Sequence, residues 1–224
     1  MDKFRVLKVK ESVFANNEQR AEELRSELKN KKTYLLNVMG SPGSGKTVTL
    51  TKLINMLKAD LRIGVMEADI DSDVDAHTIA DQTGAKVIQL HTGGMCHLDS
   101  DMTRQGLEGL GIENLDLIFL ENVGNLVCPA EFDTGAIKSL AILSVPEGDD
   151  KPLKYPLMFT VINALIINKI DVMPYFDFDQ QACTERVHKL NPDIPVFPVS
   201  AKTGEGMEAL ANWLLGEVKA WQAE

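Results

Sequence analysis

The sequence predicts an α/β fold, a mainly parallel sheet with helices on both faces, from two observations. Short apolar runs alternate with stretches of helical period along most of the chain, which is typical of parallel strands joined by helical crossovers. A glycine-rich turn also separates the first apolar run from a helical stretch that begins near Thr47. The charged, proline-containing connection Glu147–Lys154 is expected to be a mobile loop. The expected strands are Tyr34–Met39, Ile63–Glu67, Lys86–Leu90, Leu117–Glu121, Lys138–Val145, Ala164–Asn168 and Pro195–Val199.

One domain with a short lead-in segment is expected from the length and composition. The chain has 224 residues, of which 44% are hydrophobic, enough for one well-packed core. We expect this domain to span residues 33–224. Residues 1–32 are expected to carry a helix packed on the domain, starting at Asn16 or Asn17 and running to about Lys29. Its apolar positions recur at helical spacing among charged ones: Ala21, Leu24 and Leu28.

Charge and hydropathy argue against two classes of partner. Lysine and arginine number 23 against 33 aspartates and glutamates, and a net charge of -10 repels a nucleic-acid backbone. The segment Met1–Lys10 is charged, and no apolar run approaches the roughly 20 residues of a membrane span. We therefore expect a cytoplasmic protein that binds neither nucleic acid nor membranes. Three cysteines, an odd number without an export signal, indicate individual thiols rather than a disulfide framework.

A phosphate-binding loop is predicted at Gly40–Thr47, where GSPGSGKT matches the pattern G-x-x-x-x-G-K-S/T. Its glycines let backbone N–H groups turn inward around phosphates, and the following helix presents its positive end. Lys46 is expected to reach the β- and γ-phosphates, and Thr47 to hold magnesium. A plain glycine-rich turn is the alternative, which the strand–loop–helix context disfavours. The expected nucleotide contacts of this loop are Gly40, Gly43, Ser44, Gly45, Lys46, Thr47 and Val48.

The segment Asn168–Asp171, with the sequence NKID, predicts guanine rather than adenine as the base. The Asp171 carboxylate can accept hydrogen bonds from guanine N1–H and from the N2 amino group, and adenine offers no such donor pair. Lys169 can lie over the base. Further along, the Ala201 N–H can be offered to the base oxygen in a segment that resembles the last guanine-nucleotide motif: Ser200, Ala201 and Lys202. Each segment alone is ordinary turn chemistry, but their order after a phosphate loop predicts a GTP and GDP site.

The segment ENVG, Glu121–Gly124, is the expected γ-phosphate sensor, because it follows a strand where many GTPases carry D-x-x-G. The Gly124 N–H would contact the γ-phosphate, and Glu121 would act in the magnesium shell. Phosphoryl transfer then needs Lys46, magnesium and an aligned water, with no covalent nucleophile. The sequence therefore predicts a GTPase.

A second acidic segment, Glu67–Asp75, is expected to form the first switch region. Asp69 and Asp75 are the residues we expect at magnesium and at the attacking water. Asp71 and Asp73 are interpreted as a solvated loop and a helix cap.

Cys96, His97 and Cys128 form a candidate transition-metal site, since both loops that carry them leave the same edge of the predicted sheet. Two thiolates and an imidazole suit zinc or nickel, with a fourth position left for water, a backbone group or a second subunit. Buried packing is the alternative for cysteines of a cytosolic α/β protein. The position of Cys128, four residues after Gly124, would couple metal affinity to nucleotide state. Cys183 has no such neighbour and is expected in the core.

Together these segments resemble the HypB family, the GTPases that assist nickel insertion into nickel–iron hydrogenase. The resemblance covers nearly the whole chain from Tyr34 onward, and ENVGNLVCP and EGDDKPLKYP are much more specific than the phosphate loop. The remaining matching segments are VMGSPGSGKT, EADIDSDVDA, LHTGGMCHLD, INKID and VSAKTGEG.

The resemblance implies several properties that the residues alone do not. It implies a metal site at Cys96, His97 and Cys128, and GTP-dependent homodimerisation that shares the metal. It also implies delivery of nickel to a hydrogenase large-subunit precursor, alongside a partner nickel chaperone. Lys151 is implied near the base and the dimer partner.

Three features depart from the family pattern. Residues Met1–Lys32 contain neither the cysteine-rich motif nor the histidine-rich tract of some relatives, so nickel storage is not expected. Asp101 and Gln105 stand where some members carry further histidines. Thr78 and Asn163 stand where arginine and aspartate are expected.

Three functions remain open at this point. The first is a slow GTPase whose nucleotide state controls the metal site; no arginine finger is evident, so a low intrinsic rate is expected. The second is a metal-binding protein in which GTP acts mainly as a dimerisation ligand. The third is a urease-type nickel-maturation GTPase, against which ENVGNLVCP argues.

Overall fold

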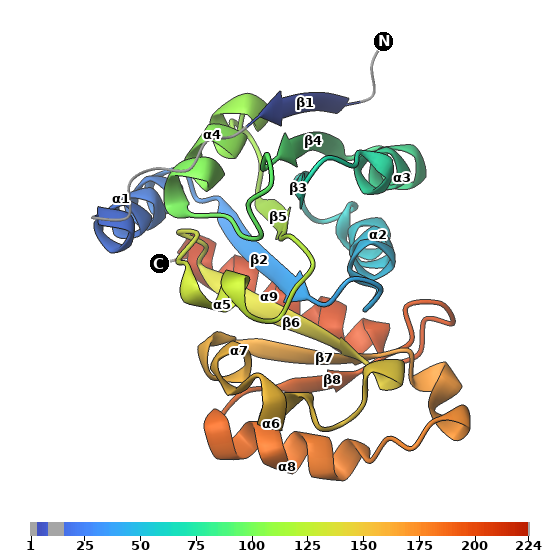
Figure 1. Ribbon diagram of the computed structural model, residues 1–224. Coiled ribbons are helices and arrows are strands. Elements are labelled where there is room, and N and C mark those ends of the chain that lie inside the picture. Colours follow the sequence, from blue (N-terminus) through green and yellow to red (C-terminus); the bar gives the residue numbers. More distant parts are fainter. Residues whose placement is uncertain (1–3, 9–15, 224) are drawn as a thin grey trace.

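The computed structural model describes residues 4–8 and 16–223, and within them a single sheet of parallel strands forms the centre (Figure 1). The strands lie in the order β1-β4-β3-β5-β2-β6-β7-β8, and every neighbouring pair is parallel. The α/β prediction is therefore confirmed. The strands are β1 Phe4–Lys8, β2 Tyr34–Gly40, β3 Ile63–Asp69, β4 Lys86–His91, β5 Leu117–Glu121, β6 Lys138–Ser144, β7 Ala164–Asn168 and β8 Val196–Pro198.

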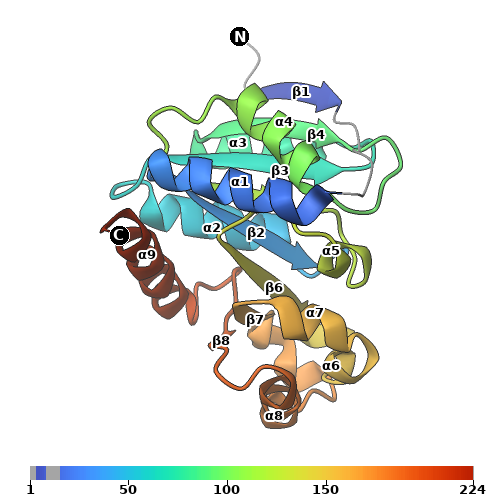
Figure 2. The same ribbon diagram turned by 90° about the vertical axis from the view of Figure 1, so that its left-hand side faces the viewer.

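Helices cover both faces of this sheet, as Figures 1 and 2 show together. The α-helices are α1 Asn17–Asn30, α2 Lys46–Leu57, α3 Val74–Thr83, α4 Ser100–Leu110, α5 Cys128–Glu131, α6 Lys151–Lys154, α7 Pro156–Val161, α8 Gln180–Leu190 and α9 Met207–Ala223. Two 3-10 helices are η2 Val145–Glu147 and η3 Ile170–Tyr175.

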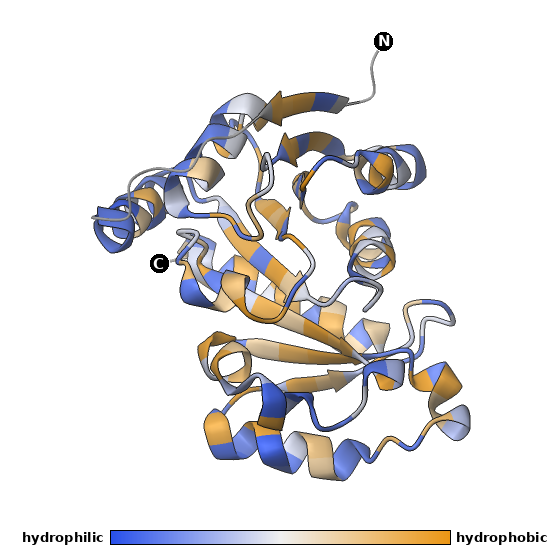
Figure 3. Ribbon diagram, viewed as in Figure 1, coloured by the Kyte–Doolittle hydropathy of each residue, from blue (hydrophilic) through white to orange (hydrophobic). Residues whose placement is uncertain are grey.

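Alternation along β2 divides the core between the two faces. Leu36 packs with Leu50 of α2 and Leu210 of α9 on one face. Leu35, its neighbour, packs with residues of α1 and α4, including Leu28, on the other. Because successive side chains of a strand point to opposite faces, one strand buried on both sides reads as a continuous apolar run. Figure 3 shows this apolar centre with hydrophilic residues along the outer helices.

Helix α1 is fixed to the second face by buried leucines and by ion pairs. Leu24 and Leu28 are buried against the sheet and α4. The Arg20 guanidinium pairs with the Asp101 carboxylate of α4. Asn17 is the first residue of the helix and donates from its side chain to the Asp133 carbonyl, whereas the N-cap residue ahead of it makes no side-chain capping bond.

The structure contains one strand that was not predicted, and one expectation about a loop was wrong. Strand β1 was not predicted, because Phe4–Lys8 is short and charged, yet it pairs with β4 at the edge of the sheet. The expected loop Glu147–Lys154 instead ends one 3-10 helix and forms α6, and a proline stands in the first turn of each. Proline favours these positions because its fixed φ is pre-organised for a helix start.

Among the described residues, no helix has the length and apolar character needed to cross a membrane.

Candidate functional site

A cavity of about 640 Å³ lies at the carboxyl ends of β2, β3 and β5, where functional groups were expected. Residues of the phosphate loop, the first acidic segment and the ENVG segment line it together. Its lining includes Gly43, Gly45, Lys46, Thr47, Val48, Glu67, Asp69, Asp75, Thr78, Glu121, Gly124 and Lys169.

The phosphate loop joins the end of β2 to the start of α2, as its sequence predicted. Gly45, with φ of 97°, is the N-cap of α2, and a methyl group there would clash with the Asn168 side chain. Only glycine tolerates both the positive φ and the close approach. The Lys46 ammonium donates to the carbonyls of Gly40 at 3.3 Å and Ser41 at 3.4 Å, so it lies inside the loop. The predicted phosphate loop therefore has the necessary geometry.

Asn168 and its neighbours hold the guanine side of the site against this loop. The Asn168 amide donates to the Ser44 carbonyl at 2.9 Å, and Lys169 Nζ donates to the Gly43 carbonyl at 2.6 Å. The Ser200 hydroxyl donates to Asp171 at 2.7 Å, which fixes the carboxylate expected to select guanine.

The last motif contacts the guanine motif directly. The Ala201 N–H, expected at the base oxygen, donates to Asn168 Oδ1 at 3.3 Å in this structure. Lys202 is exposed next to it.

Three carboxylates converge beside Thr47. Ligand oxygens of Glu67, Asp75 and Glu121 all lie within 4.8 Å of one another, and the Thr47 hydroxyl donates to Glu121 at 2.9 Å. The structure thus brings together three residues expected at magnesium and adds Glu67. Sequence reasoning missed Glu67 as a ligand. The available signal was a charged residue within a buried strand, directly before an acidic run.

Burial raises the pKa of both buried glutamates in this cluster. The pKa of Glu67 rises to about 9, first through burial and then through the neighbouring Glu121 charge. The pKa of Glu121 rises to about 7, again through burial first, while the Lys46 charge opposes the rise. Each ionised carboxylate here is costly unless a cation neutralises it.

The donor set fits a divalent cation that prefers oxygen. Glu67 Oε2 and Glu121 Oε2 are buried and accept no hydrogen bond from any residue that the structure describes. Magnesium takes carboxylate oxygens, a hydroxyl and phosphate oxygens, which is the set that this cavity offers. Glu67, Asp75, Glu121 and Thr47 would hold the ion, which would neutralise phosphate charge there.

Asp69 lies near this cluster but uses its carboxylate differently. Asp69 Oδ1 accepts from the N–H groups of Asp71 at 3.0 Å and Ser72 at 2.8 Å, which closes a turn. Asp71 is exposed, and Asp73 is the N-cap residue of α3 without a side-chain capping bond. A magnesium role for Asp69 stays a prediction.

The ENVG segment approaches the phosphate loop closely enough to sense its contents. A methyl group on Gly124 would lie 3.0 Å from the Pro42 ring, so glycine allows the approach. The next residue, Asn125, forms an isolated antiparallel bridge with Gly40. The segment that should respond to the γ-phosphate is therefore in direct contact with the loop that should bind it.

Cys96 and Cys128 meet although they are far apart in sequence. Their Sγ atoms are 2.7 Å apart and both thiols are free. The pKa of Cys128 is raised, first by the hydrogen bond with Cys96 and then by burial. Two neighbouring thiols are a ligand pair that zinc and nickel both accept.

His97 is less well placed than the two cysteines. Its ring stacks on Phe132 with centroids 3.6 Å apart, and its Nδ1 lies 4.0 Å from Cys96 Sγ. In the part of the chain that the structure describes, these three side chains do not form a set with all ligand atoms within 4.8 Å. A metal role for His97 stays a prediction.

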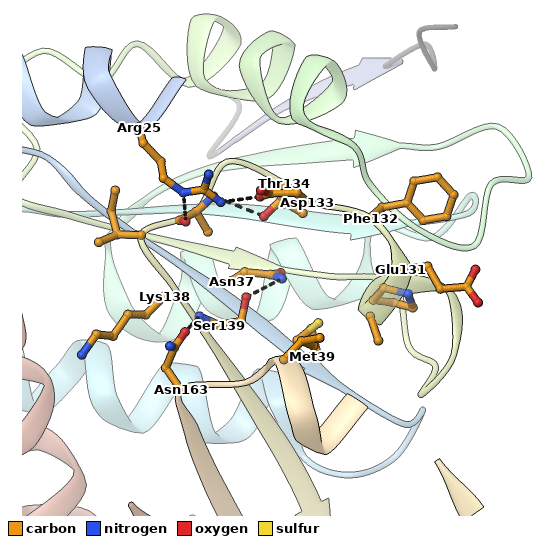
Figure 4. A pocket seen from close by; sticks show the side chains of 15 residues that line it. Arg25, Asn37, Met39, Glu131, Phe132, Asp133, Thr134, Lys138, Ser139 and Asn163 are labelled. Carbon is orange, nitrogen blue, oxygen red and sulfur yellow. Dashed lines mark hydrogen bonds and ion pairs between the residues drawn. The ribbon is translucent and has the colours of Figure 1, made fainter. Parts of the chain in front are cut away.

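A second cavity, of about 320 Å³, lies between α1, α7 and the segment after Cys128 (Figure 4). At its floor Asn37 donates to the Ser139 hydroxyl at 3.3 Å and accepts from Asn122 at 3.1 Å. At its roof Arg25 pairs with Asp133. The Asn37–Asn122 hydrogen bond connects the lining of this cavity to the residue that follows Glu121.

The remaining predicted residues have structural contacts. Lys151 is outside the lining of the nucleotide cavity and lies 5.7 Å from the Tyr155 ring centre, so its role near the base stays a prediction. Cys183 is fully buried, as expected. Three positions that depart from the family pattern bond to backbone carbonyls or N–H groups: Thr78 to Val74, Asn163 to Ser139 and Gln105 to Asp101.

Comparison with known proteins agrees with this geometry. Residues 34–198 match the family described as CobW/HypB/UreG, nucleotide-binding domain. Hydrogenase maturation factor HypB of Rhizobium leguminosarum bv. viciae is 44% identical over 214 residues, covering 96% of this chain and 71% of that protein. Hydrogenase/urease maturation factor HypB of Helicobacter pylori strain J99 is 38% identical over 213 residues, covering 93% and 87%. The crystal structure of HypB from Helicobacter pylori in complex with nickel has a TM-score of 0.86 at 38% identity, covering 92% of this chain and 96% of that chain.

Proposed function

This chain belongs to the HypB family, and from that premise we propose that it is a GTP-hydrolysing metallochaperone that delivers nickel to a hydrogenase precursor. Its nucleotide state controls a nickel-binding site that contains Cys96 and Cys128. The observation that carries the proposal is the 2.7 Å contact of these thiols, one of which follows the ENVG segment that lines the nucleotide cavity.

The nucleotide half of the proposal follows from charge and position. Lys46 lies inside the phosphate loop and neutralises charge on the β- and γ-phosphates. Gly124 offers its N–H to the γ-phosphate from beside Pro42. Magnesium supplies further charge neutralisation when bound, and Asp75 is the carboxylate of the cluster that is exposed and can orient water. With no arginine finger evident, turnover is slow, below about 1 s⁻¹.

The metal half of the proposal follows from the donor chemistry. Two thiols are soft ligands that suit nickel and zinc alike, so cellular supply decides which ion is carried. Within one chain they leave positions open, and a second copy of this chain, joined on GTP binding, completes the site. Nickel is here the cargo, passed with a partner nickel chaperone to the precursor in the cytoplasm.

A nickel titration of the purified protein tests this proposal. Affinity, stoichiometry and molecular mass are measured with GDP and with a non-hydrolysable GTP analogue. We expect nickel affinity or stoichiometry to differ between the two nucleotide states. This difference should be lost in Cys96→Ala and Cys128→Ala. Cys183→Ala is the matched control and keeps wild-type binding, because Cys183 is fully buried and apart from the pair. Binding that ignores both nucleotide and the two cysteines contradicts the metal half.

Two alternatives are separated by transfer assays. If GTP acts only as a dimerisation ligand, nickel transfer to the precursor proceeds undiminished with the non-hydrolysable analogue. The name of the Helicobacter pylori relative includes urease, so a urease precursor is the alternative recipient. Loaded protein offered both precursors distinguishes them.

A further inference from the structure

Asn125 joins three parts of the molecule that the sequence places far apart. Its backbone bridges Gly40 at the start of the phosphate loop. Its side-chain amide donates to the Cys96 carbonyl at 2.6 Å. Its side-chain oxygen accepts from the N–H groups of Val127 at 2.8 Å and Cys128 at 2.9 Å.

We infer that Asn125 is the positioning residue that transmits nucleotide state to the cysteine pair. The inference rests on the proposed function, because it needs a metal site whose affinity depends on the nucleotide. It names the contact through which that dependence passes.

The contacts of Asn125 fall into two groups: those on the nucleotide side (the input) and those to the cysteine-bearing segments (the output). On the nucleotide side, Asn125 follows Gly124 directly, and Gly124 packs against Pro42 of the phosphate loop. A γ-phosphate that draws the Gly124 N–H toward itself therefore moves the backbone of Asn125 as well. The side chain moves with its backbone, since the two are one residue.

On the output side, one amide group contacts both cysteine-bearing segments. The oxygen orients the first turn of α5, which begins at Cys128, by accepting two otherwise unpaired N–H groups. The nitrogen fixes the Cys96 backbone from the other loop. Displacement of Asn125 changes the position of one Sγ relative to the other, and a shared metal ion is sensitive to that distance.

The Asn125 side chain supplies both a donor and an acceptor at this position. Aspartate keeps the acceptor for Val127 and Cys128 but replaces the donor with a second oxygen, which faces the Cys96 carbonyl. Alanine removes both contacts. The Asn125→Asp variant therefore breaks the link between the two loops while the first turn of α5 stays capped.

The test measures a ratio of affinities. Nickel affinity is determined with GDP and with a non-hydrolysable GTP analogue in wild type, Asn125→Asp and Asn125→Ala. Coupled sites typically change each other's affinity by about 5- to 150-fold. We expect this ratio to fall to within about twofold of one in both variants. An effect of the new charge on affinity is common to both nucleotide states and cancels in the ratio.

Asn55→Asp is the matched control. Asn55, on α2, also donates to backbone carbonyls, those of Thr51 and Gln82, and accepts from Lys58. The same change of amide to carboxylate there keeps the wild-type ratio. Thermal unfolding confirms that each variant is folded, and Asn125→Asp remains informative if Asn125→Ala is not.

The outcomes separate the inference from the proposed function. A wild-type ratio of one overturns the proposed coupling and the role of Asn125 with it. A wild-type ratio above one that survives in both Asn125 variants overturns this inference alone. Loss of nickel binding in both nucleotide states also overturns it, because Asn125 would then build the metal site instead of coupling it. By reciprocity, saturating nickel must change the ratio of GTP-analogue affinity to GDP affinity by the same factor in wild type, and must leave that ratio unchanged in the variants.

Discussion

The Thr47 hydroxyl donates a hydrogen bond of 2.9 Å to the Glu121 carboxylate. Thr47 is the second residue of α2, the helix after the phosphate loop, and Glu121 is the last residue of β5, which pairs with β2. The bond therefore ties the phosphate loop to the segment that carries Gly124 and Cys128. The Thr47 hydroxyl and the Glu121 carboxylate both lie where a phosphate-bound cation is expected.

Replacing Lys46 with alanine should abolish turnover. Lys46 is the buried cation within the phosphate loop, and loss of such transition-state stabilisation costs about 10²- to 10³-fold in rate. Phosphate release under steady-state conditions is the measurement. Lys189→Ala, an exposed lysine of α8, keeps the wild-type rate. Turnover that survives in Lys46→Ala would sink the GTPase assignment.

Replacing Asp171 with asparagine should change the preferred base from guanine to xanthine. The carboxylate accepts two donors of guanine, and the amide instead offers one donor and one acceptor, which match the O2 and N1–H of xanthine. Loss of paired polar contacts in a specific site typically costs about 10⁴-fold or more, so GTP affinity should fall steeply. Competition between GTP and XTP measures the change. Unaltered GTP preference would show that Asp171, held here by Ser200, does not contact the base.

Replacing Glu67 with glutamine should stabilise the protein at alkaline pH in the absence of divalent cations. The folded-state pKa of Glu67 is raised to about 9, so between about pH 4.5 and 9 the folded protein binds a proton that the unfolded chain has released. Stability therefore falls as pH rises through this window, by up to about 1.4 kcal/mol per pH unit. Glutamine keeps the shape and removes the titration.

Thermal unfolding in a chelator measures this effect of Glu67→Gln. The melting temperature of the variant should exceed that of wild type at pH 8.5, by about 2–4 °C for each kcal/mol, and the gap should narrow toward pH 5. Glu185→Gln, at an exposed position of α8, should show no such dependence. Added magnesium should stabilise wild type more than the variant. A gap that is independent of pH would contradict the raised pKa.

Replacing Leu24 with alanine should destabilise the domain by about 2–5 kcal/mol, the usual cost of a buried leucine. Leu24 lies on the buried side of α1 and is 2% exposed, and Gly135 also approaches it closely. Thermal unfolding measures the loss, and Glu23→Ala, on the exposed side of α1, should change stability by less than about 0.5 kcal/mol. Equal stability of the two variants would mean that α1 does not pack on the domain in solution.

Most strands were predictable because they are buried on both faces and therefore read as apolar runs bounded by turns. Strand β1 was not, since an edge strand with charged residues lacks that signal. Helix α6 was missed because charge and proline suggest a loop, whereas proline here opens a short helix.

The candidate site divides in the same way. Lys46 and Asp171 belong to local patterns whose spacing defines their chemistry, so the sequence predicted them. Glu67 belongs to no such pattern. Its role depends on lying opposite Glu121 across neighbouring strands β3 and β5.

The sequence by itself determined the strand–loop–helix order, the phosphate loop and the guanine motif, because each depends on residues close together in the chain. Only the tertiary structure decided which distant residues meet. It placed Cys96 against Cys128, His97 against Phe132, and Asn125 between the phosphate loop and both cysteines. The physical reason is that parallel strands bring the loops at their carboxyl ends to one edge in an order set by the sheet, and that order is not the order of the chain.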